Sequence, residues 1–147
     1  MKGAEWKWNL AAGALLAALV FGAFGGALFC GFVWFDDHGY VYENPAVTGG
    51  LTQAGLRWAW TTTHMYNWHP LTWLAHMADA ELYGLNPAGH HFSSLLLYAA
   101  NAILLFFFLR RATGRAAAAL AAAALWAVHP LRVESVVWIS ERKDVLA

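Results

Sequence analysis

The stretch "LAAGALLAALVFGAFGGALFCGFVWF", residues 10 to 35, contains no charged residue. Its 26 residues exceed the roughly 20 that a helix needs to cross a hydrocarbon core about 30 Å thick. We therefore expect a first transmembrane helix over residues 10 to 35. A signal peptide is the alternative, because Lys2 and Lys7 form a basic start, but the apolar part of such a peptide has only about 7 to 15 residues.

The composition of the whole chain also indicates a membrane protein. Of its 147 residues, 60% are hydrophobic and 12% are charged, about half the roughly 25% charged fraction of soluble domains. The nine Trp and five Tyr are residue types that favour the headgroup region of a bilayer. Because the net charge is zero, nothing indicates a nucleic-acid partner.

Two further apolar segments predict an all-α, multi-pass protein with three spans. The second span is expected over 92–109, where Arg110 and Arg111 end the apolar run. The third is expected over 116–139. Only 116–128 is free of charge, so this helix can cross a bilayer only if it continues to residue 139. A soluble Ala-rich helix is the alternative for this segment.

The distribution of basic residues predicts an orientation. Lys2 and Lys7 precede the first span, and Arg110, Arg111 and Arg115 surround the turn 110–115 between the second and third. The positive-inside rule then places the N-terminus and this turn in the cytoplasm. The loop 36–91, in which Arg57 is the only Arg or Lys, and the segment 129–144 are expected on the outer, periplasmic face.

Two amphipathic helices are predicted in the outer loop, over 52–64 and 70–83. Thr52 can cap the first, and Pro70 suits the first turn of the second. Leucine and alanine recur along the second at helical spacing, while the other face is polar: Leu71, Leu74, Ala78 and Leu82 against His76, Asp79 and Glu81. We expect both helices to lie in the membrane interface and to roof a cavity; a purely structural role is the alternative.

Two adjacent carboxylates, Asp36 and Asp37, stand where the first apolar run ends. Neighbouring side chains point about 100° apart on a helix and to opposite faces of a strand, so we expect them to have different roles. One could act as a general base towards a hydroxyl, and the other could orient it or hold a cation. A simple cap at the membrane end of a helix is the alternative.

Two His-Pro-Leu elements stand at predicted outer boundaries, in "NWHPLTWL" (67–74) and "VHPLRVESV" (128–136). They suggest that His69 and His129 line one site, although each Pro could merely start or kink a helix. Arg132 and Glu134 would lie near membrane depth, where ionisable groups are functional candidates. Seven His without HExxH spacing or clustered Cys predict no metal site.

The order of "DD", "WHPLTWL" and "HPLRVESVVWISERKDVL" resembles the N-terminal part of the tetratricopeptide-repeat (TPR) carrying, O-mannosyltransferase-like proteins of the GT-C glycosyltransferase superfamily. Animal members act in the endoplasmic reticulum, and bacterial relatives suggest the bacterial cytoplasmic membrane here. The resemblance runs from about Phe32 to Ala147. Matches to the family pattern are Asp36, Asp37, His69, Pro70, Leu71, His129, Pro130, Glu134, Arg142 and Asp144, while Glu141 and Lys143 replace small residues of the animal motif.

The resemblance implies inverting transfer of a sugar from a polyprenyl-phosphate carrier to a hydroxyl of a protein or glycan on the outer face. Asp36 would be the base and Asp37 its companion. The residues expected to bind substrate or lipid phosphate are His69, His129, Arg132, Glu134, Arg142, Lys143 and Asp144. No cofactor is required by this chemistry, and a divalent cation remains an open expectation.

Members of this family have many more spans and a C-terminal TPR array. We therefore expect residues 1–147 to be a single, incomplete GT-C-like module that is inactive alone, with a fourth span beginning near "KDVLA" and no TPR region. Two other functions stay open: a membrane anchor or scaffold of a TPR protein, and a fragment of a transporter or channel, which the ionisable residues near membrane depth would suit.

Overall fold

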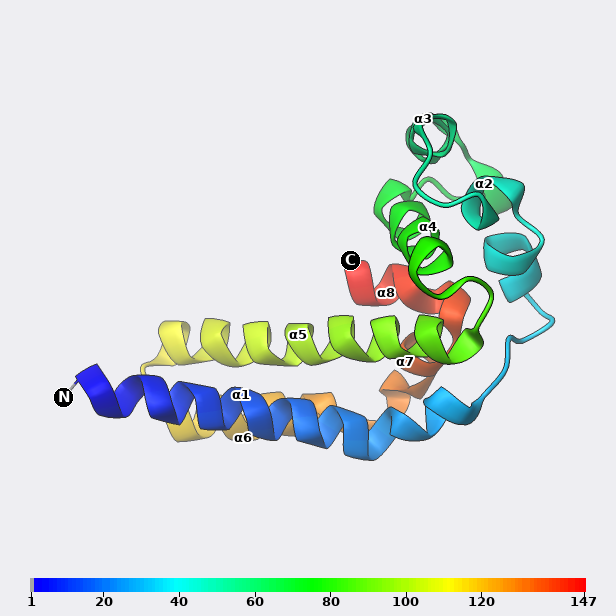
Figure 1. The fold of residues 1–147 in the computed structure, drawn as a ribbon. Coiled ribbons are helices and arrows are strands. Elements are labelled where there is room, and N and C mark those ends of the chain that lie inside the picture. Colours follow the sequence, from blue (N-terminus) through cyan, green and yellow to red (C-terminus); the bar gives the residue numbers. More distant parts are fainter. Residues whose placement is uncertain (1) are drawn as a thin grey trace.

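The computed structural model describes residues 2–147, and every regular element in that range is a helix. Figure 1 shows three long helices side by side and a group of short elements at one end of them. The long helices are α1 (Lys2–Phe24), α5 (Pro87–Thr113) and α6 (Ala116–Ala127). The short α-helices are α2 (Pro45–Thr48), α3 (Gln53–Thr61), α4 (Pro70–Tyr83), α7 (Val133–Val137) and α8 (Arg142–Leu146). Single 3₁₀ or π turns are η1 (Gly25–Phe29), η2 (His38–Tyr42), η3 (His64–Tyr66), η4 (Pro130–Arg132) and η5 (Ile139–Glu141).

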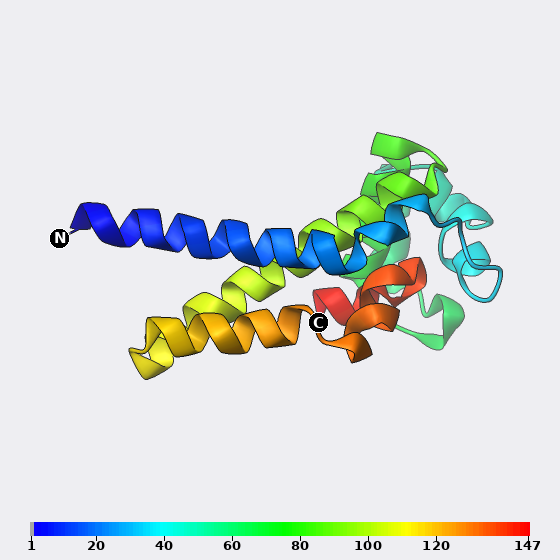
Figure 2. The ribbon, with the colours of Figure 1, turned by 90° about the horizontal axis from the view of Figure 1, so that it is seen from below.

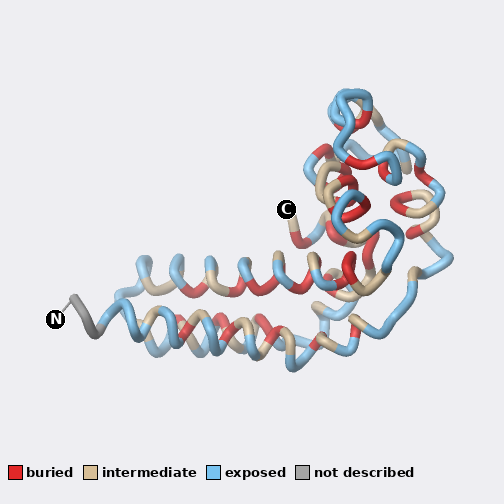
Figure 3. The backbone as a smooth tube through the Cα atoms, viewed as in Figure 1, coloured by how far each residue is buried: buried red, intermediate tan, exposed pale blue. Residues whose placement is uncertain are grey.

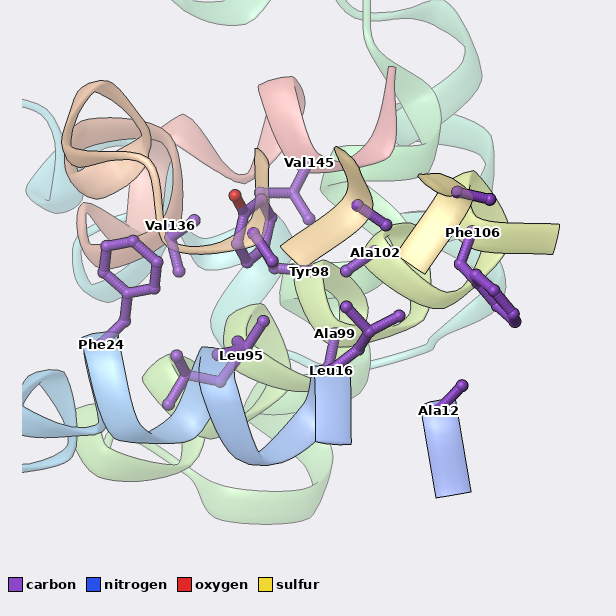
Figure 4. Close-up of a cluster of buried hydrophobic side chains, with 14 residues drawn as sticks. Ala12, Leu16, Phe24, Leu95, Tyr98, Ala99, Ala102, Phe106, Val136 and Val145 are labelled. Carbon is purple, nitrogen blue, oxygen red and sulfur yellow. The ribbon is translucent and has the colours of Figure 1, made fainter. Parts of the chain in front are cut away.

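A continuous apolar core joins the three long helices (Figure 4). Leu16 of α1 and Leu95 of α5 are fully buried in it. Helix α6 contributes small side chains at four-residue spacing, Ala119, Ala123 and Ala127, and such a row lets two helix backbones approach closely. Tyr98 of α5 stacks on Trp126, with ring centroids 4.9 Å apart, and donates a hydrogen bond to its carbonyl oxygen at 3.1 Å. Figure 3 shows that the opposite surfaces of the helices are largely exposed, and the exposed residues of these helices include Leu15, Leu104 and Leu125.

Two helical stretches are long and apolar enough to cross a membrane, Glu5–Phe29 and Pro87–Thr113. They confirm the first two predicted spans as apolar helices with shifted ends. The first ends at Phe29 instead of residue 35, because the chain tightens into a 3₁₀ turn at Gly25 and Gly26 and is extended at Cys30. The second begins at Pro87, with Asn86 as its N-cap, five residues before the predicted start.

The predicted continuous helix over 116–139 is wrong. Helix α6 ends at Ala127, and the following piece, Pro130–Val137, is bent from it by 57°. Pro130 lacks an N–H group, its ring would collide with the carbonyl four residues earlier, and it holds the preceding His129 in an extended conformation (ψ 129°). This segment can be a third span only as a broken pair of helices. Helix α8 has five residues, so a fourth span stays a prediction.

The short elements form a cap at one end of the bundle, which we define as residues 30–86 and 129–147. Figures 1 and 2 show both parts of the cap at the same end, opposite the turn between α5 and α6. At that opposite end, Arg110 of α5 donates to the side-chain oxygen of Asn9 in α1. The basic turn and the start of the chain therefore lie together, as the predicted topology requires; which side of a membrane they face stays a prediction.

Both predicted loop helices are present, although the first ends at Thr61 instead of residue 64. Helix α3 is capped by Thr52, whose hydroxyl oxygen accepts from the Gly55 N–H at 3.0 Å. Helix α4 begins at Pro70 and ends before Gly84, which has the positive φ (60°) that favours glycine.

Two members of the predicted apolar row of α4 point outward, Leu71 at 58% and Leu82 at 71% exposed, whereas Leu74 packs partly against the cap's own core. A bilayer interface would cover the two exposed leucines. The inner face instead packs Trp73 and Met77 in the cap's own core, and it also buries His76, Asp79 and Thr72.

Gly89, in the first turn of α5, provides a test of the contact between that turn and the end of α4. A Cβ atom there would stand 2.3 Å from Cγ of Tyr83. Replacing a helical glycine by alanine normally stabilises a helix by about 0.5–1 kcal/mol, but overpacking costs about 1–3 kcal/mol. We expect Gly89→Ala to lower the thermal unfolding midpoint in detergent.

The matched control is Gly22→Ala in α1, where an added Cβ meets nothing within 4 Å. It should leave the midpoint unchanged or raise it. An increase with Gly89→Ala would show that the two elements are not packed as described.

Candidate functional site

Asp37 is a fully buried structural carboxylate. Its Oδ2 accepts from the Val33 N–H at 2.8 Å, and its Oδ1 accepts from the Ser140 N–H at 3.0 Å. The side chain thus ties the chain leaving α1 to the segment just before α8, and both oxygens are occupied by backbone donors. A cap of a departing helix was one alternative for the acidic pair, but Asp37 joins two segments 103 residues apart.

Asp36 is in a different environment, half-buried at the surface of the cap. Within residues 2–147, its carboxylate makes no hydrogen bond or ion pair to a protein group. The Asp36 carboxylate affects the pKa of the Tyr40 phenol. Burial raises this pKa, the Lys143 ammonium opposes the rise, and the carboxylates of Asp36 and Glu141 add to it. Asp36, Lys143 and Glu141 are therefore all near one phenol.

A stack of rings leads from Tyr40 to the surface. The centroids of Tyr40 and Trp73 are 4.9 Å apart, as are those of His69 and Trp73, and Tyr40 and His69 stack at 5.5 Å. Nζ of Lys143 lies 5.7 Å from the Tyr40 centroid. Burial lowers the pKa of the His69 imidazole, and Lys143 lowers it further, so His69 is a neutral hydrogen-bonding group at neutral pH.

The outer end of this stack opens into a pocket of about 350 Å³, which we call the His69–Lys143 pocket. Its lining is Trp60, Trp68, His69, Pro70, Leu71, Thr72, Lys143, Leu146 and Ala147. The size lies in the range of small-molecule sites, and the lining combines apolar and aromatic surface with a few polar groups, as such sites do. Nζ of Lys143 is 2.5 Å from Oε1 of Glu141. The pocket offers aromatic faces, a neutral imidazole and one cation.

Arg142, one residue before Lys143, is fully buried. It donates to Asp79 Oδ2 at 2.5 Å, to Ser94 Oγ at 3.2 Å and to the His90 carbonyl oxygen at 2.7 Å. Burial lowers the pKa of this guanidinium, and the Asp79 carboxylate opposes the change. The side chain predicted to bind lipid phosphate therefore holds α8 against α4 and α5 and is shielded from the surface.

The other predicted residues lie in separate places. His129 and Arg132 line a pocket beside Trp126, with the Arg132 guanidinium carbon 4.9 Å from that ring. Glu134 lines a groove of about 260 Å³ with Cys30, His91 and Trp138. Asp144 is exposed and accepts from the Ser135 hydroxyl at 3.1 Å. Of the predicted set, the structure brings His69 and Lys143 into one pocket, whereas His129 lines a different pocket.

Sequence reasoning did not assign Tyr40, Trp60 or Trp68 to a site. A signal existed for Trp68, which directly precedes the His-Pro-Leu element. It also missed a buried group formed by His76 and Asp79 of α4 with His90 of α5, because a turn separates His90 from the other two and no fixed spacing identifies the three.

Comparison of the chain with models of known protein families, with curated proteins and with solved structures finds no match.

Loss of the buried Arg142 guanidinium should lower the stability of the folded protein far more than loss of the Lys143 ammonium. In Arg142→Met, Asp79 would keep a buried charge without its partner, a change that typically costs about 3–5 kcal/mol. In Lys143→Met only a partly exposed pair is lost, worth about 0–1 kcal/mol. We expect a large fall in thermal midpoint for the first variant and a small one for the second, measured in the same detergent. Equal effects would contradict the buried network.

Proposed function

We propose that this chain is part of a membrane glycosyltransferase that moves a sugar from a polyprenyl-phosphate carrier to a hydroxyl of a protein or glycan on the outer face of the membrane. The observation that carries the proposal is the difference between the paired aspartates. Asp37 is engaged by backbone N–H groups, whereas Asp36 is half-buried one helical turn before Tyr40, whose ring centroid lies 5.7 Å from Lys143 Nζ. Asp36 is therefore assigned as the base and Asp37 as the residue that positions it.

The reaction is a single displacement at the anomeric carbon. The Asp36 carboxylate takes the proton of the acceptor hydroxyl while the hydroxyl oxygen forms a bond to the anomeric carbon. The bond from the anomeric carbon to the phosphate oxygen breaks, and the polyprenyl phosphate leaves with the electron pair. Attack from the face opposite the phosphate inverts the configuration.

The His69–Lys143 pocket supplies groups that such a donor needs. A cation near the departing phosphate stabilises the charge that develops there, and Lys143 is the cation that lines the pocket. Its partner Glu141 would be exchanged for the phosphate. The rings of Trp60 and Trp68, both more than half exposed, give the sugar a flat apolar surface, and the exposed Leu71 beside them faces the region where the lipid tail would lie.

Asp36→Asn tests the base. We expect sugar transfer by the full-length protein in membrane vesicles, with a polyprenyl-phosphate sugar as donor, to fall by about 10²–10⁴-fold, the usual contribution of a general base. Protein abundance should stay constant, because no protein group bonds to this carboxylate within the described residues.

The matched control is Glu43→Gln, an exposed acid of the same cap, which should transfer sugar at the normal rate. Asp37→Asn should instead reduce the amount of folded protein. Unchanged transfer by Asp36→Asn at normal abundance would refute the base assignment, and no transfer by the wild type would favour a membrane anchor or scaffold.

The orientation can be tested with single cysteines in a Cys30→Ser background, since Cys30 is the chain's one cysteine. Gln53 in the cap and Ala112 at the opposite end are both exposed. In intact cells, a membrane-impermeant maleimide should label Gln53→Cys and should label Ala112→Cys only after the membrane is opened. The reverse pattern would place the cap in the cytoplasm and exclude a donor presented on the outer face.

A further inference from the structure

A buried group of potential metal ligands lies where α4 meets the first turn of α5. His76 and Asp79, three residues apart on one face of α4, meet His90 of α5, and one ligand atom of each lies within 4.8 Å of the others. His76 and His90 are fully buried and Asp79 is 4% exposed. None of the three takes part in the proposed sugar transfer.

The protonation of His90 is informative because its Nε2 lies 3.0 Å from the Gly84 carbonyl oxygen. A carbonyl can only accept, so Nε2 must carry the hydrogen, and in the neutral ring Nδ1 carries a lone pair. That lone pair stands 3.5 Å from Asp79 Oδ2. A positive charge between these two acceptors, either a proton on Nδ1 or a metal ion, would satisfy both of them in a dry interior.

The ring nitrogens of His76 also lack partners within residues 2–147. Neither of its ring nitrogens, both buried, has a hydrogen-bond partner within the described part of the chain, and Nδ1 of His90 has none either. An unpaired buried polar atom costs about 1–3 kcal/mol, so native cores pair or ligate such atoms.

We propose that His76, Asp79 and His90 bind one divalent first-row transition metal ion, with Zn²⁺ as the expected occupant. Imidazole nitrogen and carboxylate oxygen suit Zn²⁺ at about 2.0–2.2 Å. Ligand atoms around a tetrahedral ion at that distance are about 3.3 Å apart. The 3.5 Å between His90 Nδ1 and Asp79 Oδ2 is close to this value, and the ligand atom of His76 lies within 4.8 Å of both.

The surroundings provide the supporting contacts that metal sites use. A ligating His usually donates its second N–H to a carbonyl or carboxylate, as His90 does to Gly84. Asp79 Oδ1 accepts from the Ser93 hydroxyl at 2.6 Å, which fixes the carboxylate. The ion would cross-link α4 of the cap to the first turn of α5.

The nearby guanidinium of Arg142 sets the charge balance. Arg142 and the ion would share Asp79, so one carboxylate would face more positive charge than it neutralises. Asp37 is a second fully buried carboxylate at the same end of the bundle. A hydroxide or water as fourth ligand fills the coordination that three protein ligands leave open.

The His76→Phe variant distinguishes a role of His76 as a metal ligand from a role in core packing. It keeps a buried aromatic ring but removes the ring nitrogens that could bind a metal. The full chain, purified in detergent and stripped with a chelator, is titrated with Zn²⁺, and bound metal is measured by mass spectrometry. We expect one Zn²⁺ per wild-type chain and a thermal midpoint that rises with the logarithm of free Zn²⁺. In His76→Phe, affinity should fall at least about tenfold and the midpoint should no longer respond.

The control His129→Ala removes an exposed imidazole and should bind Zn²⁺ as the wild type does. Wild-type Co²⁺ loading gives a second measurement that needs no variant: a tetrahedral site shows strong visible absorption bands, which Zn²⁺ should abolish. The proposal is overturned if stripped wild-type protein binds no Zn²⁺ and gives no such bands, or if His76→Phe retains full binding.

Discussion

The buried ion pair between Arg142 and Asp79 is the contact on which the cap depends. A guanidinium removed from water must have all its charge and donors compensated, and here Asp79, Ser94 and the His90 carbonyl do so. These partners come from α4 and α5, so the pair fixes the end of the described chain against both. Asp37 repeats the arrangement nearby through the Ser140 N–H. Two buried polar anchors therefore hold one short segment, 140–142, in place.

Each anchor leaves an adjacent like charge at the surface. Asp37 is buried and Asp36 is not; Arg142 is buried and Lys143 lines the pocket. Neighbouring side chains on a helical turn point about 100° apart, so burying one member of each pair turns the other outward. Lys143 Nζ lies 5.7 Å from the Tyr40 ring centroid, and Asp36 lies one helical turn before Tyr40. The two buried anchors thus fix the backbone from which a carboxylate and an ammonium reach the surface.

Features with local causes were predictable from sequence, and features that depend on distant partners were not. Thr52, Pro70 and Gly84 define helix ends through their own side chains or φ angles, and α3 and α4 appeared where they were expected. The helix break at Pro130 also has a local cause, the proline itself. A continuous helix over 116–139 was nevertheless expected, because the 13 uncharged residues 116–128 are too few to span a bilayer alone. Nothing near Arg142 indicates that its partner is 63 residues away, so its burial, and the separation of His69 from His129, could not be inferred.

The bend after Ala127 has a consequence for the surrounding lipid. Helix α6 has 12 residues and is therefore about 18 Å long, well short of a hydrocarbon core of about 30 Å. A bilayer beside α6 would have to thin locally or let headgroups and water sink towards Trp126 and Arg132, as short hydrophobic segments generally require. The bilayer would then be thinner on the side of the protein where α6 lies. The proposed polyprenyl-phosphate donor could approach the cap there without being lifted out of the leaflet.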